Sequence, residues 1–409
     1  MKFLLIGNPE NRRISAFVEA LKSEGLENPI ILSHQELIQA PELLYQYKDL
    51  DLTVRIDSVG ENSEVERLLL YQGHAEAALS SAQSISPERL NLREVRYGEL
   101  FCPRQYHCGY EQYLYKLQKI FDEIPHWNLL NTPAAIKELF DKRLTSQKYH
   151  QAGIPVPDSI VQINTAEKID IEVSNSSSID ARKNSNVGIS TNAIYPWNPD
   201  DLRRAMHKNY WGTVFIKLSC GSSASGLAIY SYKQGGNERM ITTMMVRNGR
   251  IFNSLKMQII TGRKKIDYLI SFLLNEGSII ERSIPKMRLH GDYIDCRVLM
   301  IDKEPCFTVV RQSKYPVTNL HLGGQRGDLE LLMQQVGTNA WDSAMESCRN
   351  VASLHKSFQL GVDLMFERDF NQHRILESNA FGDLLPRLTK EGKSVYAYQI
   401  SRLLKKYSL

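Results

Sequence analysis

Residues 361–379 read GVDLMFERDFNQHRILESN and predict a β-hairpin, because two segments with apolar residues flank a polar turn. With the turn centred on Phe370, Asp363 lies opposite Glu377, and Asn379 lies two residues further along the second strand. Side chains alternate along a strand, so these three polar residues share one face, with opposed Cβ atoms about 4.5–5.5 Å apart. The hairpin is the starting point for the rest of the chain.

Two carboxylates at this distance repel each other unless a positive charge lies between them. Asp363, Glu377 and Asn379 together offer the hard oxygen ligands that Mg²⁺ prefers, and they leave other positions for water and phosphates. The alternative is a solvated hairpin face. Met365 and Ile375 fall on the same predicted face, which argues against full exposure. The three polar residues are therefore candidate Mg²⁺ ligands.

A second candidate is a loop of small residues that follows an apolar strand. Residues 214–226 read VFIKLSCGSSASG, which predicts a strand with Lys217 near its end and then a loop of glycine and serine. Small residues let consecutive backbone N–H groups converge on an anion, and a nearby lysine supplies the compensating charge. The order differs from GxxxxGK[ST], because Lys217 precedes the glycines. A phosphate cradle and a flexible turn are both open interpretations here.

Polar residues also gather on the strands and the loop before the hairpin. Asp295 and Arg297 lie two residues apart on the predicted strand 294–301, hence on one face, and Arg311 ends the next predicted strand. An aspartate and an arginine on one face most often form a structural salt bridge. Asn319 belongs to a polar loop that could contact a ligand.

Length and composition exclude several classes of protein. The 409 residues include 50 Lys+Arg and 46 Asp+Glu, a formal net charge of +4, and 42% are hydrophobic. This composition predicts two or three globular domains and excludes a disordered, collagen-like or small disulfide-stapled protein. We find no block of five basic residues and no apolar run near the ~20 residues that span a bilayer. We therefore expect neither nucleic acid nor membrane as a partner.

The six cysteines are scattered without a CxxC pair, which favours reduced thiols and a cytoplasmic location. Cys102, His107 and Cys108 form one local cluster that could be the corner of a metal site. It lacks a second ligand pair at a suitable spacing, so a structural role is favoured.

Several segments indicate how the chain is organised. An apolar strand, an amphipathic helix and a second apolar strand fill the first 32 residues, as at the start of an open parallel α/β sheet. Residues 60–125 look helical and rich in tyrosine, which is typical of core packing. Thr132 is a predicted helix N-cap, and Gly153 ends a second predicted helix. Residues 172–198 are dense in serine and asparagine and predict a long mobile loop.

Together these motifs resemble the ATP-grasp superfamily, specifically the branch of glutathione synthetases and ribosomal-protein glutamate ligases. The resemblance covers residues 131–387. It rests on DKRLTSQKYHQAGIPVP, FIKLSCGSSASG, the ERSI segment, DCRVLMID, NLHLGG, and GVDLMF with ILESNAFGD. It implies an α/β protein with α+β lobes, that is, an ATP-grasp fold behind an N-terminal Rossmann-like pre-ATP-grasp domain.

The implied division of the chain has four parts. Residues 1–130 form the N-terminal α/β domain, and residues 131–154 form connecting helices. Residues 155–283 form the small lid lobe, which includes the loop at 172–198, and residues 284–409 form the large catalytic lobe.

The resemblance also implies roles for individual residues. Lys142 and Lys217 are expected at the nucleotide phosphates, Glu281 and Ile284 at the adenine, and Lys286 is the candidate for the ribose. The loop over the terminal phosphates contributes Ser219, Gly221, Ser222, Ser223, Ser225 and Gly226. Arg311 and Asn319 match positions near the transferred phosphoryl group, Arg297 is grouped with them as catalytic, and Asp363, Glu377 and Asn379 match the Mg²⁺ ligands.

The implied reaction is ATP- and Mg²⁺-dependent ligation, with Mn²⁺ as a substitute ion. A carboxylate is activated as an acyl phosphate and joined to an amine of the amino acid or peptide type. Two alternatives stay open. One is a small-molecule kinase, which needs the same residues for phosphoryl transfer, and the other is a nucleotide-binding regulatory protein without turnover. The expected partners are small-molecule or peptide substrates, and a homodimer is left open.

Overall fold

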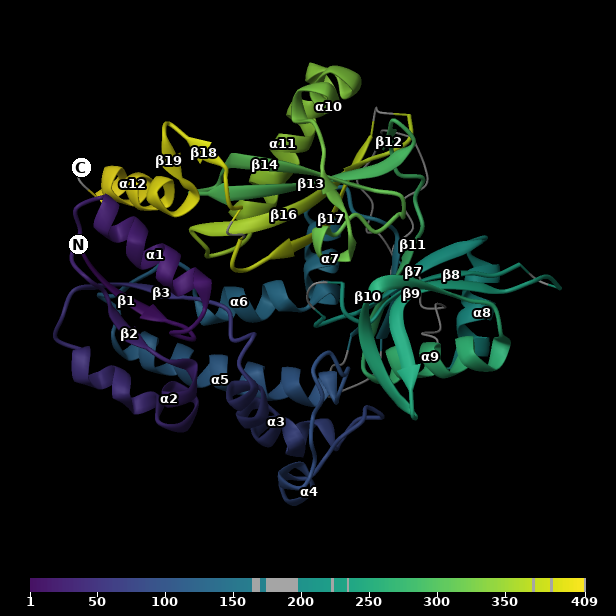
Figure 1. Cartoon of the computed structure of the whole chain (residues 1–409), viewed down its shortest axis with the longest axis horizontal. Coiled ribbons are helices and arrows are strands. Elements are labelled where there is room, and N and C mark those ends of the chain that lie inside the picture. The colour runs from purple at the N-terminus through teal and green to yellow at the C-terminus, as the bar shows by residue number, and fades with distance from the viewer. Residues whose placement is uncertain are drawn as a thin grey trace.

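The computed structural model describes residues 1–163, 170–173, 198–221, 224–233, 235–369, 372–382 and 385–407. Within these ranges the chain forms four β-sheets of four, seven, six and two strands, with helices packed around them (Figure 1). The three larger sheets follow one another along the chain. This confirms the predicted α/β class.

The first sheet is parallel and confirms the interpretation of the N-terminal residues. Its strands are β1 (Lys2–Ile6), β2 (Ile30–Leu32), β3 (Leu52–Ile56) and β4 (Asn128–Leu129), in the order β2-β1-β3-β4. The helices between them are α1 (Arg12–Ser23), α2 (His34–Gln39), the 3₁₀ helix η1 (Pro41–Tyr47), α3 (Ser63–Ala77), α4 (Pro87–Asn91) and α5 (Pro103–Glu123).

Helices α3 and α5 cross at a pair of glycines. A Cβ atom added at Gly73 would lie 1.9 Å from the carbonyl oxygen of Gln105, and one at Gly109 would lie 1.8 Å from that of Leu69. Only glycine allows two backbones to approach this closely. On α5, Tyr110 and Tyr113 are buried in the core, as predicted, whereas Tyr115 is exposed.

Two connecting helices begin and end where the sequence predicts. Thr132 caps α6 (Pro133–Phe140), because its side chain accepts a hydrogen bond from the Ala135 N–H. Asp141 caps α7 (Lys142–Gln151), because its side chain accepts one from the backbone N–H of Arg143. Gly153 follows α7 with a φ of +73°, the left-handed conformation that ends helices.

The second sheet is antiparallel and has the order β10-β9-β8-β7-β11-β5-β6. Its strands are β5 (Ser159–Ile163), β6 (Asp170–Val173), β7 (Thr213–Leu218), β8 (Leu227–Ser231), β9 (Arg239–Arg247), β10 (Arg250–Ile260) and β11 (Ser278–Arg282). Apolar residues of α8 (Pro199–Lys208) and α9 (Arg263–Asn275) pack against this sheet (Figure 1).

The predicted loop at 172–198 begins too early. Residues 172 and 173 belong to β6, which pairs with β5 in antiparallel fashion, and Asn198 caps α8. Backbone pairing with a neighbouring strand overrides the polar local composition at this point. Residues 174–197 lie outside the described residues.

The third sheet carries the hairpin and has the order β15-β14-β13-β16-β17, with β12 paired to β13. Its strands are β12 (Arg288–Leu289), β13 (Asp292–Ile301), β14 (Glu304–Ser313), β15 (Gln325–Arg326), β16 (Gln359–Phe366) and β17 (His373–Asn379). A short 3₁₀ helix η2 (Leu320–Leu322) follows β14, and α10 (Leu329–Val336) and α11 (Thr338–Ser353) pack on the sheet.

The hairpin register is confirmed on one side of a bulge and wrong on the other. Asp363 pairs with Glu377 and Gly361 with Asn379, as predicted. The register then shifts by one residue, so that Leu364 pairs with Ile375. Ile375 consequently lies in the apolar core instead of beside the carboxylates. A bulge of this kind moves every later side chain to the other face.

The C-terminal helix α12 (Val395–Tyr407) returns to the N-terminal sheet after the two-stranded ribbon of β18 (Thr389–Lys390) and β19 (Lys393–Ser394). It packs beside α1 (Figure 1), and one apolar cluster joins Phe3, Phe17, Tyr396 and Leu403. Arg55 lies buried between the rings of Phe17 and Tyr396. In the described part of the chain, every helix is too short or too polar to cross a bilayer.

Candidate functional site

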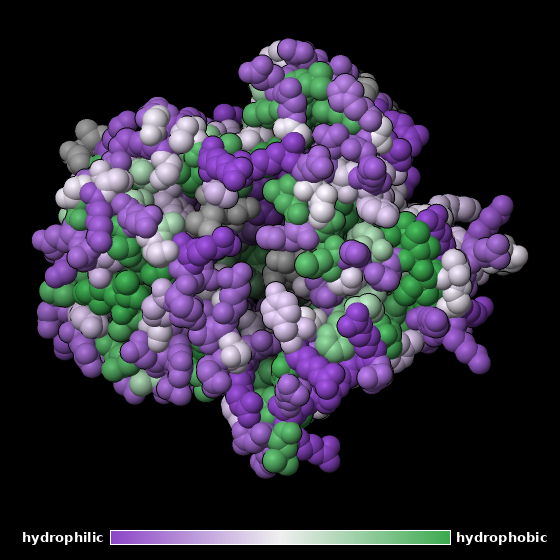
Figure 2. Space-filling view, in the orientation of Figure 1, coloured by the Kyte–Doolittle hydropathy of each residue, from purple (hydrophilic) through white to green (hydrophobic). Residues whose placement is uncertain are grey.

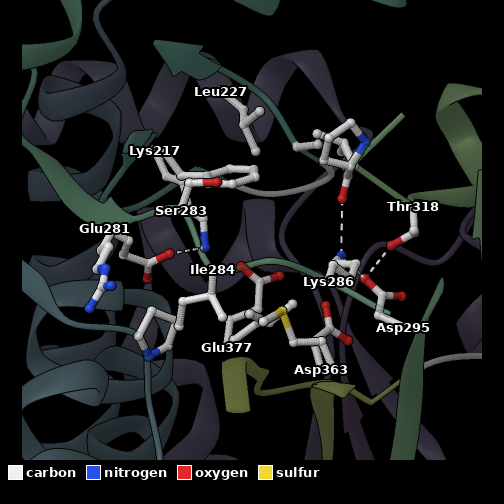
Figure 3. A pocket seen from close by; sticks show the side chains of 18 of the residues that line it. Lys217, Leu227, Glu281, Ser283, Ile284, Lys286, Asp295, Thr318, Asp363 and Glu377 are labelled. Carbon is white, nitrogen blue, oxygen red and sulfur yellow. Dashed lines mark hydrogen bonds and ion pairs between the residues drawn. The ribbon is translucent and has the colours of Figure 1, made fainter. Parts of the chain in front are cut away.

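A cavity of about 500 Å³ lies between the second and third sheets. Its walls come from β7, β8 and β11 on one side and from β13, β14, β16 and β17 on the other (Figure 3). In the space-filling view a hollow lies near the middle of the molecule, bordered mainly by polar side chains (Figure 2).

The cavity brings together most of the residues that the sequence predicts for the site. Those that line it are Lys142, Lys217, Gly221, Ser225, Glu281, Ile284, Lys286, Arg311, Asn319, Asp363 and Glu377. Four predicted residues are not among its lining, namely Ser219, Gly226, Arg297 and Asn379. Ser222 and Ser223 lie outside the described residues.

Lys217 enters the cavity because side chains alternate along β7. Thr213, Phe215 and Lys217 line the cavity, whereas Val214 and Ile216 between them are buried in the core. The Lys217 Nζ lies 2.6 Å from the Glu281 Oε2 on the adjacent strand (Figure 3). Burial lowers the pKa of Lys217, but nearby carboxylates outweigh burial and hold this pKa above its ordinary value. The lysine is thus a fixed positive charge.

Lys142 connects the small-residue loop with the hairpin. It is the first residue of α7, and its backbone N–H donates to the Ser219 carbonyl over 2.9 Å. Its Nζ donates to the Gly221 carbonyl over 2.5 Å and lies 3.6 Å from the Glu377 Oε2. Two cationic side chains, Lys142 and Lys217, therefore reach the cavity from different elements.

The loop after β7 is shaped by a close approach to its own strand. Gly226 has a φ of +60°, and a Cβ atom there would lie 2.4 Å from the Leu218 Cδ1. Gly221 and Ser225 face the cavity, whereas the Ser219 hydroxyl donates to the Gly277 carbonyl over 3.2 Å and so takes part in anchoring the loop. Ser219 therefore supports the local backbone, and its expected role at the terminal phosphates stays a prediction.

The carboxylates of the hairpin lie on the opposite wall of the cavity. Asp363 and Glu377 are strand partners and both line the cavity (Figure 3). Asn379 lies two residues along the ladder, opposite Gly361, and its Nδ2 is buried without a hydrogen-bond partner among the described residues. Two carboxylates and an amide form a donor set that fits Mg²⁺. The hairpin thus meets the chemical requirement for that ion.

Two arginines from neighbouring strands bind Asp363. Arg297 is its strand partner on β13 and donates from Nε and Nη2, the second over 3.2 Å. The Arg311 Nη2 lies 3.2 Å from Asp363 Oδ2. Burial raises the pKa of Asp363, but the two guanidinium groups outweigh burial and hold this pKa below its ordinary value. Arg297 therefore acts on the cavity through Asp363.

A second buried cluster centres on Asp295, which the sequence did not mark as a site residue. Its carboxylate accepts hydrogen bonds from Lys286 Nζ over 3.1 Å and from the Thr318 hydroxyl (Figure 3). It also accepts a hydrogen bond from Arg311 Nε over 2.7 Å. Burial lowers the pKa of Lys286 although Asp295 opposes the change. Asp295 is opposite Arg311 in the ladder, so it pairs with that residue and not with Arg297 on its own strand.

The remaining predicted residues surround this cluster. Lys286 also donates to the Pro316 carbonyl over 3.0 Å, which fixes its ammonium group inside the cavity. Asn319 faces the cavity, but its Oδ1 accepts the His321 N–H over 2.8 Å and so caps η2. Ile284 lies close to Glu281 on the second-sheet side (Figure 3).

Sequence reasoning missed the apolar part of the lining. Phe215 and Leu227 face the cavity from the second sheet, and Met365 and Leu376 face it from the hairpin. The alternation in β7 could have revealed Phe215, and Met365 shares the predicted face of Asp363. Leu376 was not predictable, because it faces the cavity beside the bulge in the hairpin. An apolar slot next to cationic and acidic groups suits a flat ring attached to phosphates.

Comparisons with solved structures identify the fold. No protein-family model and no curated protein matches the sequence. The structure matches that of the ATP-grasp ligase PsnB complexed with minimal precursor, with a TM-score of 0.52, 13% identity, and coverage of 99% of each chain. The chain therefore has the ATP-grasp fold, as the sequence predicted.

Two further matches agree with this fold. A Chryseobacterium gregarium RiPP-associated ATP-grasp ligase, in complex with ADP and a leader and core peptide, gives a TM-score of 0.51 at 12% identity over 99% of this chain and 97% of that one. The D-cycloserine synthetase DcsG gives 0.50 at 12% identity over 98% and 99%.

Proposed function

We propose that this chain is an ATP- and Mg²⁺-dependent carboxylate–amine ligase. The observation that carries the proposal is the cavity, in which Lys142 and Lys217 face the paired carboxylates Asp363 and Glu377. A phosphate chain needs cations on one side and a divalent ion held by oxygen ligands on the other. The ATP-grasp fold and the solved ligases that share it support the same conclusion.

The nucleotide would lie along the wall formed by the second sheet. Phe215, Leu227, Met365 and Leu376 provide an apolar slot for the base, and the backbone near Glu281 and Ile284 borders it. Lys142 and Lys217 would neutralise phosphate oxygens, and the loop 219–226 would cover them. Each lysine is already held by a carboxylate or carbonyl, so little reorganisation is needed on binding.

Asp363, Glu377 and Asn379 would hold Mg²⁺, or Mn²⁺ in its place. When bound, the ion supplies charge neutralisation between phosphate oxygens. Arg297 keeps Asp363 oriented and ionised, and Arg311 bridges Asp363 and Asp295 at the end of the cavity. In the proposal, Arg311 and Asn319 orient the substrate carboxylate that accepts the phosphoryl group.

The proposed reaction joins a carboxylate to an amine. A carboxylate oxygen attacks the γ-phosphorus, the bond to the bridging oxygen of ADP breaks, and an acyl phosphate forms. The amine then displaces inorganic phosphate and loses a proton to the medium. The protein has to align the groups and exclude water, because an exposed acyl phosphate hydrolyses.

The substrate class is an amino acid or a peptide. PsnB was solved with a minimal precursor, and the Chryseobacterium gregarium protein with a leader and core peptide. The proposal includes the division into residues 1–130, 131–154, 155–283 and 284–409, with the lid lobe third and the catalytic lobe last. A cytoplasmic location, where ATP and Mg²⁺ are abundant, belongs to the same proposal.

The test measures ADP and phosphate release from Mg²⁺-ATP with pooled amino acids, small carboxylates and peptides as acceptors. Hydroxylamine is added in parallel, because an acyl phosphate yields a hydroxamate and a stable phosphoester does not. Acceptor-dependent release with hydroxamate supports the ligase. Release without hydroxamate indicates the kinase, and tight nucleotide binding without release under every acceptor set indicates the regulatory alternative.

A further inference from the structure

A histidine, an aspartate and a cysteine from three separate segments meet at the loop 219–226, which follows β7. They are His107 on α5, Asp141 before α7 and Cys220 after β7 (Figure 1 labels the elements). One ligand atom from each lies within 4.8 Å of the others. The sequence analysis favoured a structural role for Cys102, His107 and Cys108, and of these three residues only His107 belongs to the present grouping.

His107 has a buried polar atom that lacks a hydrogen bond among the described residues. The residue is 2% exposed, and its Nε2 makes no hydrogen bond within the described part of the chain. The nearest carboxylate oxygen, Glu111 Oε2, lies 3.6 Å away. Leaving a buried polar atom unsatisfied costs about 1–3 kcal/mol, so such an atom needs a physical explanation.

We propose that His107, Asp141 and Cys220 bind a Zn²⁺ ion. An imidazole nitrogen, a carboxylate oxygen and a thiolate sulfur are the three ligand types that zinc takes in proteins, and three of them with a fourth position for water form a common set. One thiolate and one carboxylate balance the charge of the ion.

Hydrogen bonds already hold the three ligands in place. The backbone N–H of Lys142, next to Asp141, donates to the carbonyl of Ser219, next to Cys220, over 2.9 Å. The Ser219 N–H in turn donates to the Gly277 carbonyl over 3.0 Å. Glu276, which precedes Gly277, accepts the N–H of Arg104 in the first turn of α5 over 3.0 Å. These hydrogen bonds connect the three segments that carry His107, Asp141 and Cys220.

Asp141 also has the outer contact that metal ligands commonly show. Arg143 donates from Nε to one carboxylate oxygen over 3.1 Å and from Nη2 to the other over 2.7 Å. Such contacts orient a coordinating carboxylate and leave it further lone pairs for an ion. Cys220 is half-buried, so an ion can reach the cluster from its side. Zinc bound here would attach the loop 219–226 to α5.

The test is zinc binding by the full chain without nucleotide, measured by competition with a chromogenic chelator. We expect one equivalent of zinc in the wild type, and binding weakened at least about tenfold in His107→Gln and in Cys220→Ser. Cys306→Ser, a half-buried cysteine outside the cluster, is the matched control and should bind like the wild type. Because no ATP is present, failure here is separate from failure of the proposed ligase activity.

Two further measurements keep the test decisive. Co²⁺ in place of Zn²⁺ should give a thiolate charge-transfer absorbance that disappears in Cys220→Ser, and circular dichroism should confirm that each variant is folded. Cys108→Ala examines the neighbouring group of Glu76, Cys108 and Glu111. Absence of zinc binding, or binding that Cys108→Ala removes and the other two variants retain, would overturn the proposal.

Discussion

Arg297 on β13 and Asp363 on β16 are direct strand partners, and the guanidinium donates to both oxygens of the carboxylate. Asp363 is 5% exposed. A buried carboxylate of this kind stays ionised only with cationic partners. The pair thus prepares a charged metal-ligand candidate before any ion arrives, and it explains how two acidic residues can face each other across the hairpin.

Replacement of this arginine tests the pairing. Arg297→Met should lower the free energy of unfolding by about 3 kcal/mol, because among the described residues it leaves the buried Asp363 carboxylate with Arg311 as its remaining ion-pair partner. Chemical denaturation measures the change. Arg374→Met, which breaks a half-buried ion pair with Glu367 on the same hairpin, should cost under about 1 kcal/mol. Equal losses in the two variants would contradict the special role of Arg297.

Glu377→Gln should reduce metal-dependent ADP release by about 100-fold or more while the protein remains folded, because it removes a charged metal ligand. The assay is ADP release over a range of Mg²⁺ concentrations. Glu367→Gln at the other end of the hairpin serves as control, since Glu367 pairs with Arg374 outside the cavity. Full activity in Glu377→Gln would mean that this carboxylate holds no catalytic ion.

Lys217 has a structural and a functional role that a double variant can separate. Lys217→Met should weaken ATP binding at least about tenfold and also destabilise the fold, because Glu281 is left buried without its cation. Adding Glu281→Gln should restore much of the stability but not the affinity. Calorimetry measures the ATP affinity, and thermal unfolding measures the stability. Lys256→Met, at an exposed position, is the control for both. Restored affinity in the double variant would refute a phosphate contact.

Glu276 makes stability depend on pH near neutrality. Its buried carboxylate accepts the backbone N–H groups of Gln83 over 2.7 Å and Arg104 over 3.0 Å, and burial raises its pKa from 4.5 to about 7. Between those values the folded chain binds a proton that the unfolded chain does not. The contribution of Glu276 to the free energy of unfolding therefore falls by about 3 kcal/mol as the pH rises from 4.5 to 7.

Glu276→Gln removes that titration. The variant and the wild type can differ in free energy of unfolding at low pH. From pH 4.5 to 7 this difference should change steadily in favour of the variant, and above pH 7 it should stay constant. Urea unfolding at several pH values gives the comparison. A difference between the two proteins that does not change with pH would disprove the assigned shift.

Gly109→Ala should destabilise the chain by about 3 kcal/mol or more, because its Cβ would overlap the Leu69 backbone where α3 crosses α5. Helix propensity alone would favour alanine, so the sign of the effect identifies the cause. Gly262→Ala provides the comparison, since a Cβ atom there meets nothing within 4 Å. Thermal unfolding reports both.

Local sequence rules predicted most of the framework and part of the site. The apolar strand followed by a loop of small residues pointed to Lys217, and the hairpin symmetry pointed to Asp363 and Glu377. The bulge was invisible, because one extra residue in a strand leaves no signature in an alternating pattern, and it moved Ile375 into the core. Asp295 depends on partners from other segments, so strand spacing alone could not assign it.

The cluster of Phe3, Phe17, Tyr396 and Leu403 has a consequence for biosynthesis. During synthesis β1 and α1 leave the ribosome long before α12, which covers them only after nearly all of the other described elements have emerged. The nascent N-terminal sheet must therefore expose an apolar face throughout translation. Transiently exposed apolar surface promotes aggregation, so we expect a fragment that lacks α12 to aggregate more readily than the full chain.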